Sequence, residues 1–274
     1  MATNSKIEWT ERTWNPVLGC SIISPGCHNC YAMKMAMRLK AMALADIAAG
    51  KWPGRKRHYI EVIGPDGRWN GKLVVVPEAL SEPFEWKAPQ MIFVNSMSDL
   101  FHENLPAEDI RKVCEVMAKA NRHTFQVLTK RADRMRELLS GSLREFAELP
   151  HVWWGTSVEN RRHGLPRVEH LRQTPAAVRF LSVEPLLEDL GPLDLTGIHW
   201  VIVGGESGVR ARPLDANWAR SIRDQCVKAG VKFFFKQWSG RNVKAFGREL
   251  DGVTWDEMPA AGAELLSLSI RAAE

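Results

Sequence analysis

From residue 91 onward the chain repeats one pattern, in which a short apolar run is followed by a longer amphipathic segment. The apolar runs begin at residues 91, 125, 152, 178, 200 and 231, so successive runs start 22 to 34 residues apart. That spacing matches a strand with its crossover helix, which is the connection that parallel neighbouring strands require. The pattern therefore predicts an α/β protein with a parallel sheet, which either curls into a partial barrel or stays open and doubly wound.

The segments between the apolar runs carry apolar residues at helical spacing. We expect helices over Pro106–Ala120, Arg131–Leu139, Gly164–Arg172 and Ala216–Ala229. Pro106 suits the first turn of a helix, and Gly230 suits the left-handed residue that ends one. Each helix would cover the sheet after the strand that precedes it.

Residues 50–90 interrupt the pattern. Tyr59–Ile63 and Leu73–Val76 flank the turn signal Gly64-Pro65-Asp66-Gly67. We therefore predict a β-hairpin insertion within a main domain of residues 1–240. Residues 241–274 would form a C-terminal extension, with a helix over Ala260–Glu274.

Polar residues follow each predicted strand. In parallel α/β folds the carboxyl ends of strands meet at one edge, and functional groups collect there. This arrangement favours a barrel with one shared site over an open sheet. An isolated glutamate after a strand can also be a neighbour of a helix N-terminus, which is the alternative interpretation. The candidates for cofactor binding are Ser96, Asp99, Glu159, Asn160, Glu184, Gly204, Gly205 and Glu206.

Three of the five cysteines lie within eleven residues, as Cys20, Cys27 and Cys30 in the spacing C-x6-C-x2-C. Three thiolates are one short of a closed tetrahedral zinc site, but they suit a four-iron cluster with one iron open. Zinc with His28 as fourth ligand is the alternative. It is disfavoured because zinc sites usually pair two C-x2-C segments, and because His28 is adjacent to Cys27.

The other two cysteines fall in predicted helices. Cys114 lies on the apolar stripe of the first helix and Cys226 lies in the last, so both are expected to pack in the core. The sequence assigns no catalytic residue. Cys114, Cys226 and Tyr31, which follows Cys30 directly, are the candidates for a catalytic side chain.

The net charge is +5 with a pI near 9.0, which is weak evidence for a nucleic-acid partner. No apolar run is long enough to span a membrane, and the first residues lack a signal-peptide core, so we expect a cytoplasmic protein with reduced thiols. Basic clusters in loops could contact phosphate or be solvated side chains. The clustered cations are Arg55, Lys56, Arg57, Lys130, Arg131, Arg161, Arg162, Arg210 and Arg212.

Three segments carry a resemblance to a known family: Trp14–Cys20, Ser24–Ala32 and Gly204–Gly208. With the helix behind the cysteines and the βα repeats, they resemble the radical S-adenosylmethionine superfamily. Within it they are similar to the phage-borne three-cysteine-motif family, itself similar to spore photoproduct lyase. The resemblance covers roughly residues 6–240. The first cysteine gap is six residues where the superfamily usually has three, and Asn95–Asp99 stands where it usually has Gly-Gly-Glu.

The resemblance implies a partial (β/α)6 TIM-type barrel. Cys20, Cys27 and Cys30 would hold a 4Fe-4S cluster whose open iron binds S-adenosylmethionine and, with one electron from a donor such as flavodoxin or ferredoxin, cleaves it to a 5′-deoxyadenosyl radical. Ser96 and Asp99 would lie near the methionine moiety, and Glu159 and Asn160 near the ribose hydroxyls.

The resemblance also implies a substrate. It points to a DNA repair lyase acting on a UV-induced thymine photoproduct, whose DNA phosphates would be contacted by Arg55, Lys56, Arg57, Arg161, Arg162 and Arg210. Radical modification of RNA or of a peptide is one alternative. A zinc-stabilised nucleic-acid-binding module without catalysis is the other.

Overall fold

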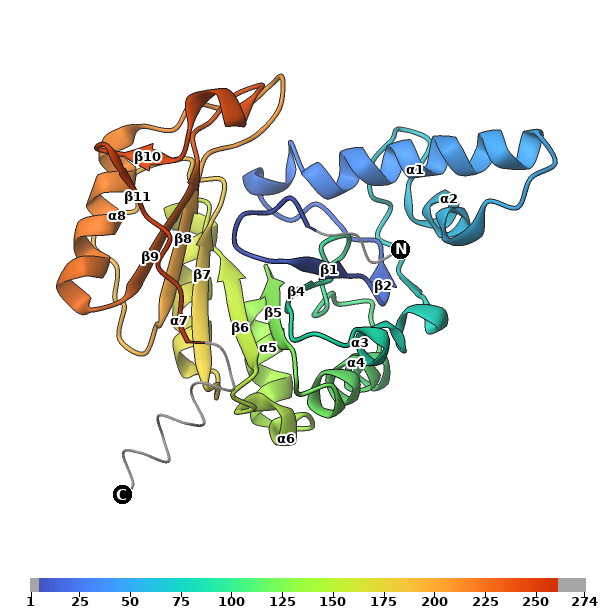
Figure 1. Ribbon diagram of the computed structural model, residues 1–274, viewed down its shortest axis with the longest axis horizontal. Coiled ribbons are helices and arrows are strands. Elements are labelled where there is room, and N and C mark those ends of the chain that lie inside the picture. Colours follow the sequence, from blue (N-terminus) through green and yellow to red (C-terminus); the bar gives the residue numbers. More distant parts are fainter. Residues whose placement is uncertain (1–4, 261–274) are drawn as a thin grey trace.

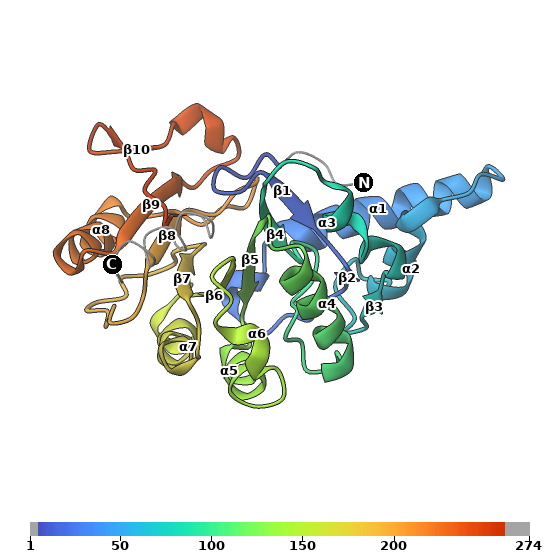
Figure 2. The ribbon, with the colours of Figure 1, turned by 60° about the horizontal axis from the view of Figure 1, so that its bottom comes forward.

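The computed structural model describes residues 5–260, and its centre is one curled sheet of seven parallel strands (Figure 1). Figure 2 shows the strands following one another in an open arc, which makes the sheet half of a barrel. The predicted α/β class and partial barrel are confirmed. In the order of hydrogen bonding the strands are β1 (Arg12–Trp14), β4 (Met91–Val94), β5 (Thr124–Thr129), β6 (Val152–Ser157), β7 (Val178–Val183), β8 (Trp200–Gly204) and β9 (Lys232–Gln237).

The helices predicted between strands are present. They are α4 (Ala107–Lys119), α5 (Ala132–Ser140), α7 (Arg161–Gln173) and α8 (Ala216–Ala229), with the short α6 (Arg144–Ala147) after α5. α8 keeps its predicted bounds because both ends are marked locally. The Asp215 side chain accepts a hydrogen bond from the Asn217 N–H, and Gly230 ends the helix with a φ of 68°.

The two faces of the sheet bury different side chains. Alternate strand residues such as Val127, Trp154 and Val203 pack with the helices in the main core. The opposite set fills the inside of the arc near the strand starts, where Trp153 and Trp200 lie edge to face with centroids 5.9 Å apart. Aromatic side chains therefore close the barrel interior at its amino end and leave the carboxyl edge for a site.

Residues 18–79 form most of a second hydrophobic cluster, which lies beside β1 and β4. α1 (Tyr31–Ala48) extends away from the sheet, and α2 (His58–Val62) packs on it (Figure 1). β2 (Val17–Leu18) pairs antiparallel with β3 (Val74–Val75). The short elements of the described chain are the 3-10 turns η1 (Pro25–Cys27), η2 (Gly54–Arg57), η3 (Pro77–Ala79) and η4 (Val243–Phe246), the helix α3 (Glu82–Glu85), and the antiparallel pair β10 (Glu249–Leu250) and β11 (Val253–Thr254).

The predicted strand Tyr59–Ile63 is wrong, because His58–Val62 is the helix α2. Tyr59 and Val62 are three residues apart and both are buried beside α1, so tertiary packing overrides the β-branched composition. The predicted turn does form: the Gly67 N–H donates to Gly64 O at 3.2 Å, and a single antiparallel bridge joins Ile63 to Trp69. The hairpin is thus reduced to one bridge, and its second arm pairs with β2.

Two further predictions concern the ends of the chain and membranes. The helix expected over Ala260–Glu274 lies outside the described residues, apart from Ala260 itself. Within residues 5–260 no helix is both long and apolar enough to cross a membrane.

Candidate functional site

The three clustered cysteines lie on one loop, residues 19–30, which we call the cysteine loop. It leaves β2, crosses the carboxyl edge of the sheet and leads into α1. At its start Gly19 forms a parallel bridge with Ser98, and the Gly19 N–H donates to Met97 O at 3.2 Å, in the segment after β4. Towards its end the Asn29 Nδ2 donates to Glu206 Oε2 at 2.9 Å, after β8. The loop is thus attached to strand ends on both sides of the arc.

The middle of the cysteine loop rests on the end of β6. A Cβ atom at Gly26 would lie 3.2 to 3.3 Å from three carbons of the Glu159 side chain, so only glycine allows this approach without a shift. Arg212, after β8, donates from Nη2 to Pro25 O at 3.0 Å. The ends of β4, β6 and β8 therefore meet at the loop, as the parallel topology predicted.

The three thiols are free and partly buried. Burial, reinforced by Asp99 and opposed by Arg131, raises the pKa of Cys20 to about 12, and Cys30 and Cys27 are near enough to add to that rise. The Cys27 Sγ lies 3.7 Å from the Ser24 Oγ. The three sulfurs thus share one electrostatic neighbourhood.

The donor set can be compared with the needs of a cluster. Among residues 5–260 no group of three or more His, Cys, Asp and Glu side chains is arranged to hold one metal ion. In a 4Fe-4S cluster each thiolate binds a different iron, so its ligands do not converge on one point. Three free thiols on a loop with a glycine at its closest approach fit that group chemically.

Each acidic candidate at a strand end is paired with a cation. Glu159, which is 0% exposed, accepts from Arg167 Nη1 at 2.7 Å, while its Oε1 has no hydrogen-bond partner. Burial opposes ionisation of Glu159, but Lys130 and Arg167 outweigh it and hold the pKa below its ordinary value. Glu159 is therefore an ionised carboxylate, near enough to the Ser24 hydroxyl of the cysteine loop for Ser24 to help lower its pKa, and its Oε1 makes no close hydrogen bond.

The carboxylates after β7 and β8 follow the same rule. Glu184 pairs with Lys236 Nζ at 2.9 Å. Glu206 accepts from both Nε and Nη2 of Arg212, and hydrogen bonds from Arg212 and Asn29 outweigh burial and keep the pKa of Glu206 low. These pairs bind the strand ends to one another and, through Arg212, to the cysteine loop.

The remaining polar candidates also have partners within the protein. The Ser96 Oγ donates to Asn15 Oδ1 at 3.1 Å, and the Asn160 side chain caps α7 by accepting from the His163 N–H at 3.0 Å. Asp99 accepts from Thr129, Lys130 and Arg131. Ser96, Asn160 and Asp99 thus already have hydrogen-bond partners within the protein, and these bonds stabilise the local fold.

Two glycines at the end of β8, Gly204 within the strand and Gly205 directly after it, are needed for packing. A Cβ at Gly204 would lie 2.6 Å from Glu184 Oε1, and one at Gly205 would overlap the backbone of Ser239. No helix begins directly after them, because α8 starts at Ala216. The segment brings neighbouring strand ends together and does not form a phosphate-binding helix start.

The three candidates for a catalytic side chain lie in different surroundings. Cys114 and Cys226 are buried in the main core, on helices outside the sheet, and burial raises the pKa of each to about 12. Tyr31 is 61% exposed at the start of α1, next to Cys30. The two cysteines therefore match the core-packing expectation in their placement.

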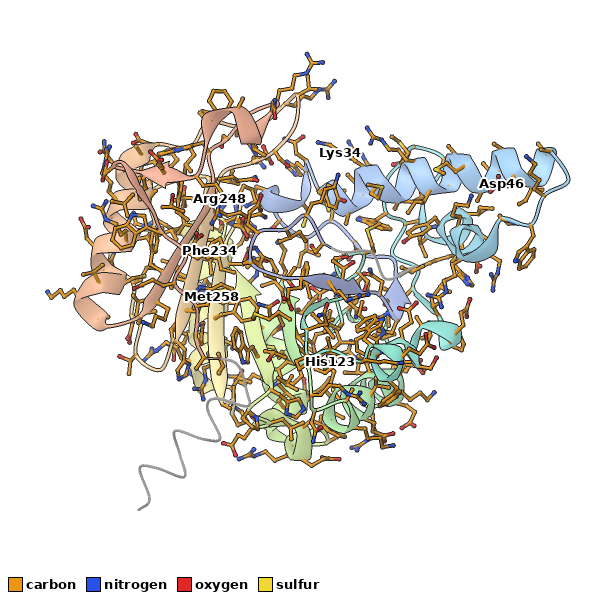
Figure 3. The ribbon with its side chains drawn as sticks, in the orientation of Figure 1. Lys34, Asp46, His123, Phe234, Arg248 and Met258 are labelled. Atoms are coloured by element: carbon orange, nitrogen blue, oxygen red, sulfur yellow. The ribbon has the colours of Figure 1, made fainter. Side chains whose placement is uncertain are left out.

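The basic candidates separate into two groups. Arg55 pairs with Glu82, Lys56 pairs with Asp46, and Arg57 lies over the Trp52 ring. Figure 3 labels Asp46 near the far end of α1, away from the sheet. By contrast Arg161, Arg162 and Arg210 are exposed and follow the ends of β6 and β8. Only this second group borders the cysteine loop's edge of the sheet.

Three arginines that position the site were not identified as such from the sequence. Arg131 and Arg212 counted only as loop cations, and Arg167 lies within a helix where nothing marked it. Acids and arginines near strand ends could have suggested such pairs. The sequence does not show which strand ends are close to one another, so it could not assign the partners.

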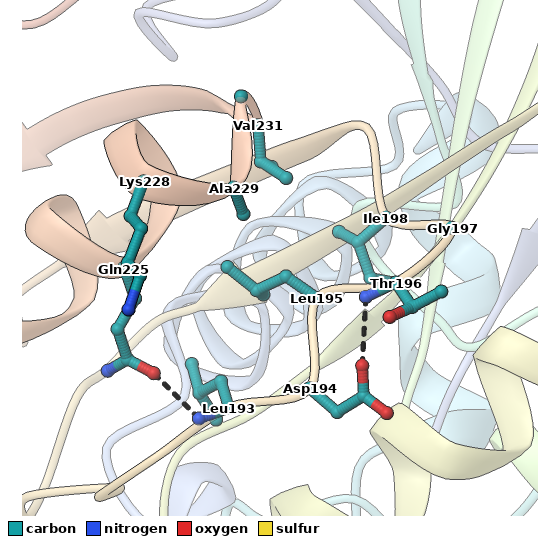
Figure 4. Close-up of a pocket in the computed structure, with 11 residues that line it drawn as sticks. Leu193, Asp194, Leu195, Thr196, Gly197, Ile198, Gln225, Lys228, Ala229 and Val231 are labelled. Atoms are coloured by element: carbon teal, nitrogen blue, oxygen red, sulfur yellow. Dashed lines mark hydrogen bonds between the residues drawn. The ribbon is translucent and has the colours of Figure 1, made fainter.

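One hollow lies away from this edge (Figure 4). It is formed by residues 193–198, before β8, and by the end of α8 with residues 230 and 231, before β9. Two of its polar side chains are already paired, since the Gln225 Oε1 accepts from the Leu193 N–H at 2.7 Å and the Asp194 Oδ1 from the Thr196 N–H at 3.0 Å. It therefore offers no competing candidate for the chemistry of the cysteines.

Comparisons with known proteins gave one family and one group of solved structures. The profile of a family described as "Protein of unknown function (DUF5131)" matches residues 4–259. No curated protein matched the chain. A structure of spore photoproduct lyase complexed with dinucleoside spore photoproduct is similar at 13% identity and a TM-score of 0.43, over 83% of this chain and 64% of that one.

A second structure is a variant of spore photoproduct lyase with bound AdoMet and dinucleoside spore photoproduct. It is similar at 12% identity, with a TM-score of 0.43 and the same coverage of 83% and 64%. The chain thus spans less than two thirds of the length of the solved structures that it matches.

Proposed function

The chain belongs to the family described as DUF5131, and from its site we propose that it is a radical S-adenosylmethionine enzyme. The observation that carries the proposal is the position of the cysteine loop. Three free thiols in the spacing C-x6-C-x2-C lie across the carboxyl edge of a half-barrel, and segments after β4, β5, β6 and β8 contact the loop. A structural metal site would need a fourth ligand, whereas a cluster with an open iron needs only three.

Cys20, Cys27 and Cys30 would hold a 4Fe-4S cluster. When bound, the cluster supplies one electron and an open iron that cleave S-adenosylmethionine into methionine and a 5′-deoxyadenosyl radical. The protein positions the thiols through the Gly26 contact to Glu159 and the Arg212 contact to Pro25, which hold the loop at two strand ends. The aromatic cluster inside the arc fills the barrel interior on the amino side of the strands, and it would keep water from reaching the site from that side.

Glu159 is our main candidate for a ligand contact in this site. Its carboxylate is buried and ionised, with the Ser24 hydroxyl nearby, and its Oε1 makes no close hydrogen bond, so Oε1 can accept a hydrogen bond from a ribose hydroxyl. Asn160 and Ser96 could contact the ligand only if each gave up its present hydrogen bond, to His163 and to Asn15 respectively. Asp99, Glu184 and Glu206 would not contact the ligand directly; each would position the cation with which it is paired, namely Arg131, Lys236 and Arg212.

For the substrate we propose damaged DNA, with repair of a thymine photoproduct as the reaction. This finer proposal rests on the resemblance of the cysteine motif and on the exposed cations Arg161, Arg162 and Arg210 beside the site. A damaged step is the one that costs least to open, so a lesion could reach the edge of the half-barrel. Arg55, Lys56 and Arg57 contribute less free charge, because each already has an acidic partner, which for Arg57 is Glu78 at 3.6 Å.

The test of the enzyme class is a count of iron and sulfide after purification without oxygen, followed by addition of reductant and S-adenosylmethionine. We expect about four irons per chain and release of 5′-deoxyadenosine. Cys27→Ala should lose both, whereas Cys226→Ala should keep both, because Cys226 is buried in α8 outside the sheet. Zinc in place of iron, or full iron in Cys27→Ala, would contradict the proposal.

A further inference from the structure

One arginine beside the cysteine loop uses every hydrogen-bond donor that it has. Arg131 follows β5 and is 7% exposed. Its Nε donates to Glu103 Oε2 at 2.8 Å, its Nη1 to Asp99 Oδ2 at 3.1 Å, and its Nη2 to Ser21 Oγ at 2.6 Å. The two remaining N–H groups point to Cys20 Sγ at 3.9 Å and to Glu103 Oε1 at 3.5 Å. The guanidinium is therefore held in one orientation, with one N–H directed at a sulfur.

Ser21 fixes the next residue of the loop in the same network. Its hydroxyl accepts from Arg131 and lies 2.9 Å from His102 Nε2. Because His102 Nδ1 accepts from the Asn104 N–H, Nε2 carries the proton and donates to Ser21. The hydroxyl can then donate to Glu103 Oε1, 3.3 Å away. Cys20 and Ser21 are thus held by groups that follow β4 and β5.

The charges around Cys20 give Arg131 a particular weight. Asp99 and Glu103 are the acids in contact with the guanidinium, and His102 is buried with a pKa that burial and Arg131 lower, so it is neutral at pH 7. Arg131 is then the cation that offsets negative charge at this thiol. The other arginine that holds the loop, Arg212, donates to the Pro25 carbonyl and to the Glu206 carboxylate rather than to a sulfur.

We propose that Arg131 is a positioning residue that tunes the cluster, raising its reduction potential through the N–H directed at Cys20 Sγ while it holds the Cys20–Ser21 segment. The inference rests on the proposed function and adds a residue that the cysteine motif does not contain. Its physical basis is that a cation and a hydrogen bond at a ligand sulfur favour the state with the additional electron. A purely structural arginine would affect how much cluster is retained but not its potential.

The experiment is a redox titration of the reconstituted full-length protein, followed by electron paramagnetic resonance, with iron counted in each sample. Arg131→Gln should lower the reduced-to-oxidised ratio at a given potential about tenfold, which is about 59 mV for one electron. Arg144→Gln is the matched control, because it also removes one arginine charge, but from an exposed pair with Glu148 on α6 and away from the cysteine loop, so its midpoint should equal that of the wild type. An Arg131→Gln midpoint equal to the wild type, at full iron content, overturns the proposal.

A second variant keeps the test decisive if Arg131→Gln retains no iron. Glu103→Gln keeps an oxygen for the Arg131 Nε and removes one of the two acids that neutralise the guanidinium. Its midpoint potential should rise, because the charge change has the opposite sign. The reduced-to-oxidised ratio at a given potential should increase severalfold. An unchanged Glu103→Gln midpoint overturns the proposal. A wild-type protein that takes up no iron refutes the proposed function itself, and this inference with it.

Discussion

Replacing Glu159 with glutamine removes one negative charge beneath the cysteine loop and keeps the shape of the side chain. The Glu159 side chain is 0% exposed and its partner Arg167 is 9% exposed, with 2.7 Å between Oε2 and Nη1. Breaking a buried ion pair from one side costs about 3–5 kcal/mol, because the other charge stays buried. We expect the lower end, about 3 kcal/mol, since the amide oxygen still accepts and Arg167 Nη1 also donates to Ser157 O.

The assay is thermal unfolding at pH 7 with iron measured in the same samples. For domains of 150–250 residues 1 kcal/mol corresponds to about 2–4 °C, so the midpoint should fall by about 6–12 °C. Glu148→Gln is the matched control, because its pair with Arg144 is exposed on both sides and such pairs contribute less than about 1 kcal/mol. A Glu159→Gln protein within about 1 kcal/mol of the wild type would refute the reasoning.

The same variant predicts a pH dependence with a defined sign. The pKa of Glu159 in the folded protein lies below its ordinary value of 4.5, so folding favours the ionised form. The stabilisation is complete above pH 4.5 and is lost as the pH falls through the folded pKa. The difference in midpoint between wild type and Glu159→Gln should therefore be constant near pH 7 and shrink below pH 4.5. A difference that grows on acidification would contradict this assignment of charge.

Two further predictions test the loop and the DNA proposal. Gly26→Ala places a methyl group 3.2 Å from Glu159 Cγ, so it should reduce iron retention with only a small change in the unfolding midpoint. An iron count and thermal unfolding measure the two effects. An unchanged iron content would show that the close approach is not needed. Arg161→Glu with Arg162→Glu should weaken DNA binding and lower the slope of log K against log salt by about 0.9 per lost phosphate contact, as measured by fluorescence anisotropy. Arg122→Glu, exposed before β5 at the opposite edge, should leave that slope unchanged, and equal effects of the two changes would argue against the assigned surface.

Local patterns determined much of this architecture. The apolar runs placed β4 to β9 and the crossover helices, because a buried strand and an amphipathic helix each leave a periodicity in their own residues. α8 begins after its Asp215 cap and ends at Gly230, where a φ of 68° favours glycine. The spacing of Cys20, Cys27 and Cys30 likewise identifies the metal-ligand candidates, because the three thiols are close neighbours along the chain.

Tertiary structure decided which charges meet. Asp99 and Arg131 lie in different βα units, and their pairing depends on β4 and β5 being neighbours in the sheet. Glu184 and Lys236 also meet only through the sheet, across the end of β8, which lies between their strands. A sequence shows that a strand ends in an acid. It does not show which cation lies beside that acid, and a buried charge needs such a partner because its desolvation is costly.

The hydrophobic cluster around α1 shows the same limit for secondary structure. Tyr59 to Ile63 has the composition of a strand, yet His58–Val62 is helical because Tyr59 and Val62 are buried together beside α1. By itself the sequence determined the repeating βα units and a loop with three thiols, since both depend on residues close in the chain. Only the tertiary structure decided that this loop rests on Glu159, Arg131 and Arg212, because burial and charge pairing there join segments more than a hundred residues apart.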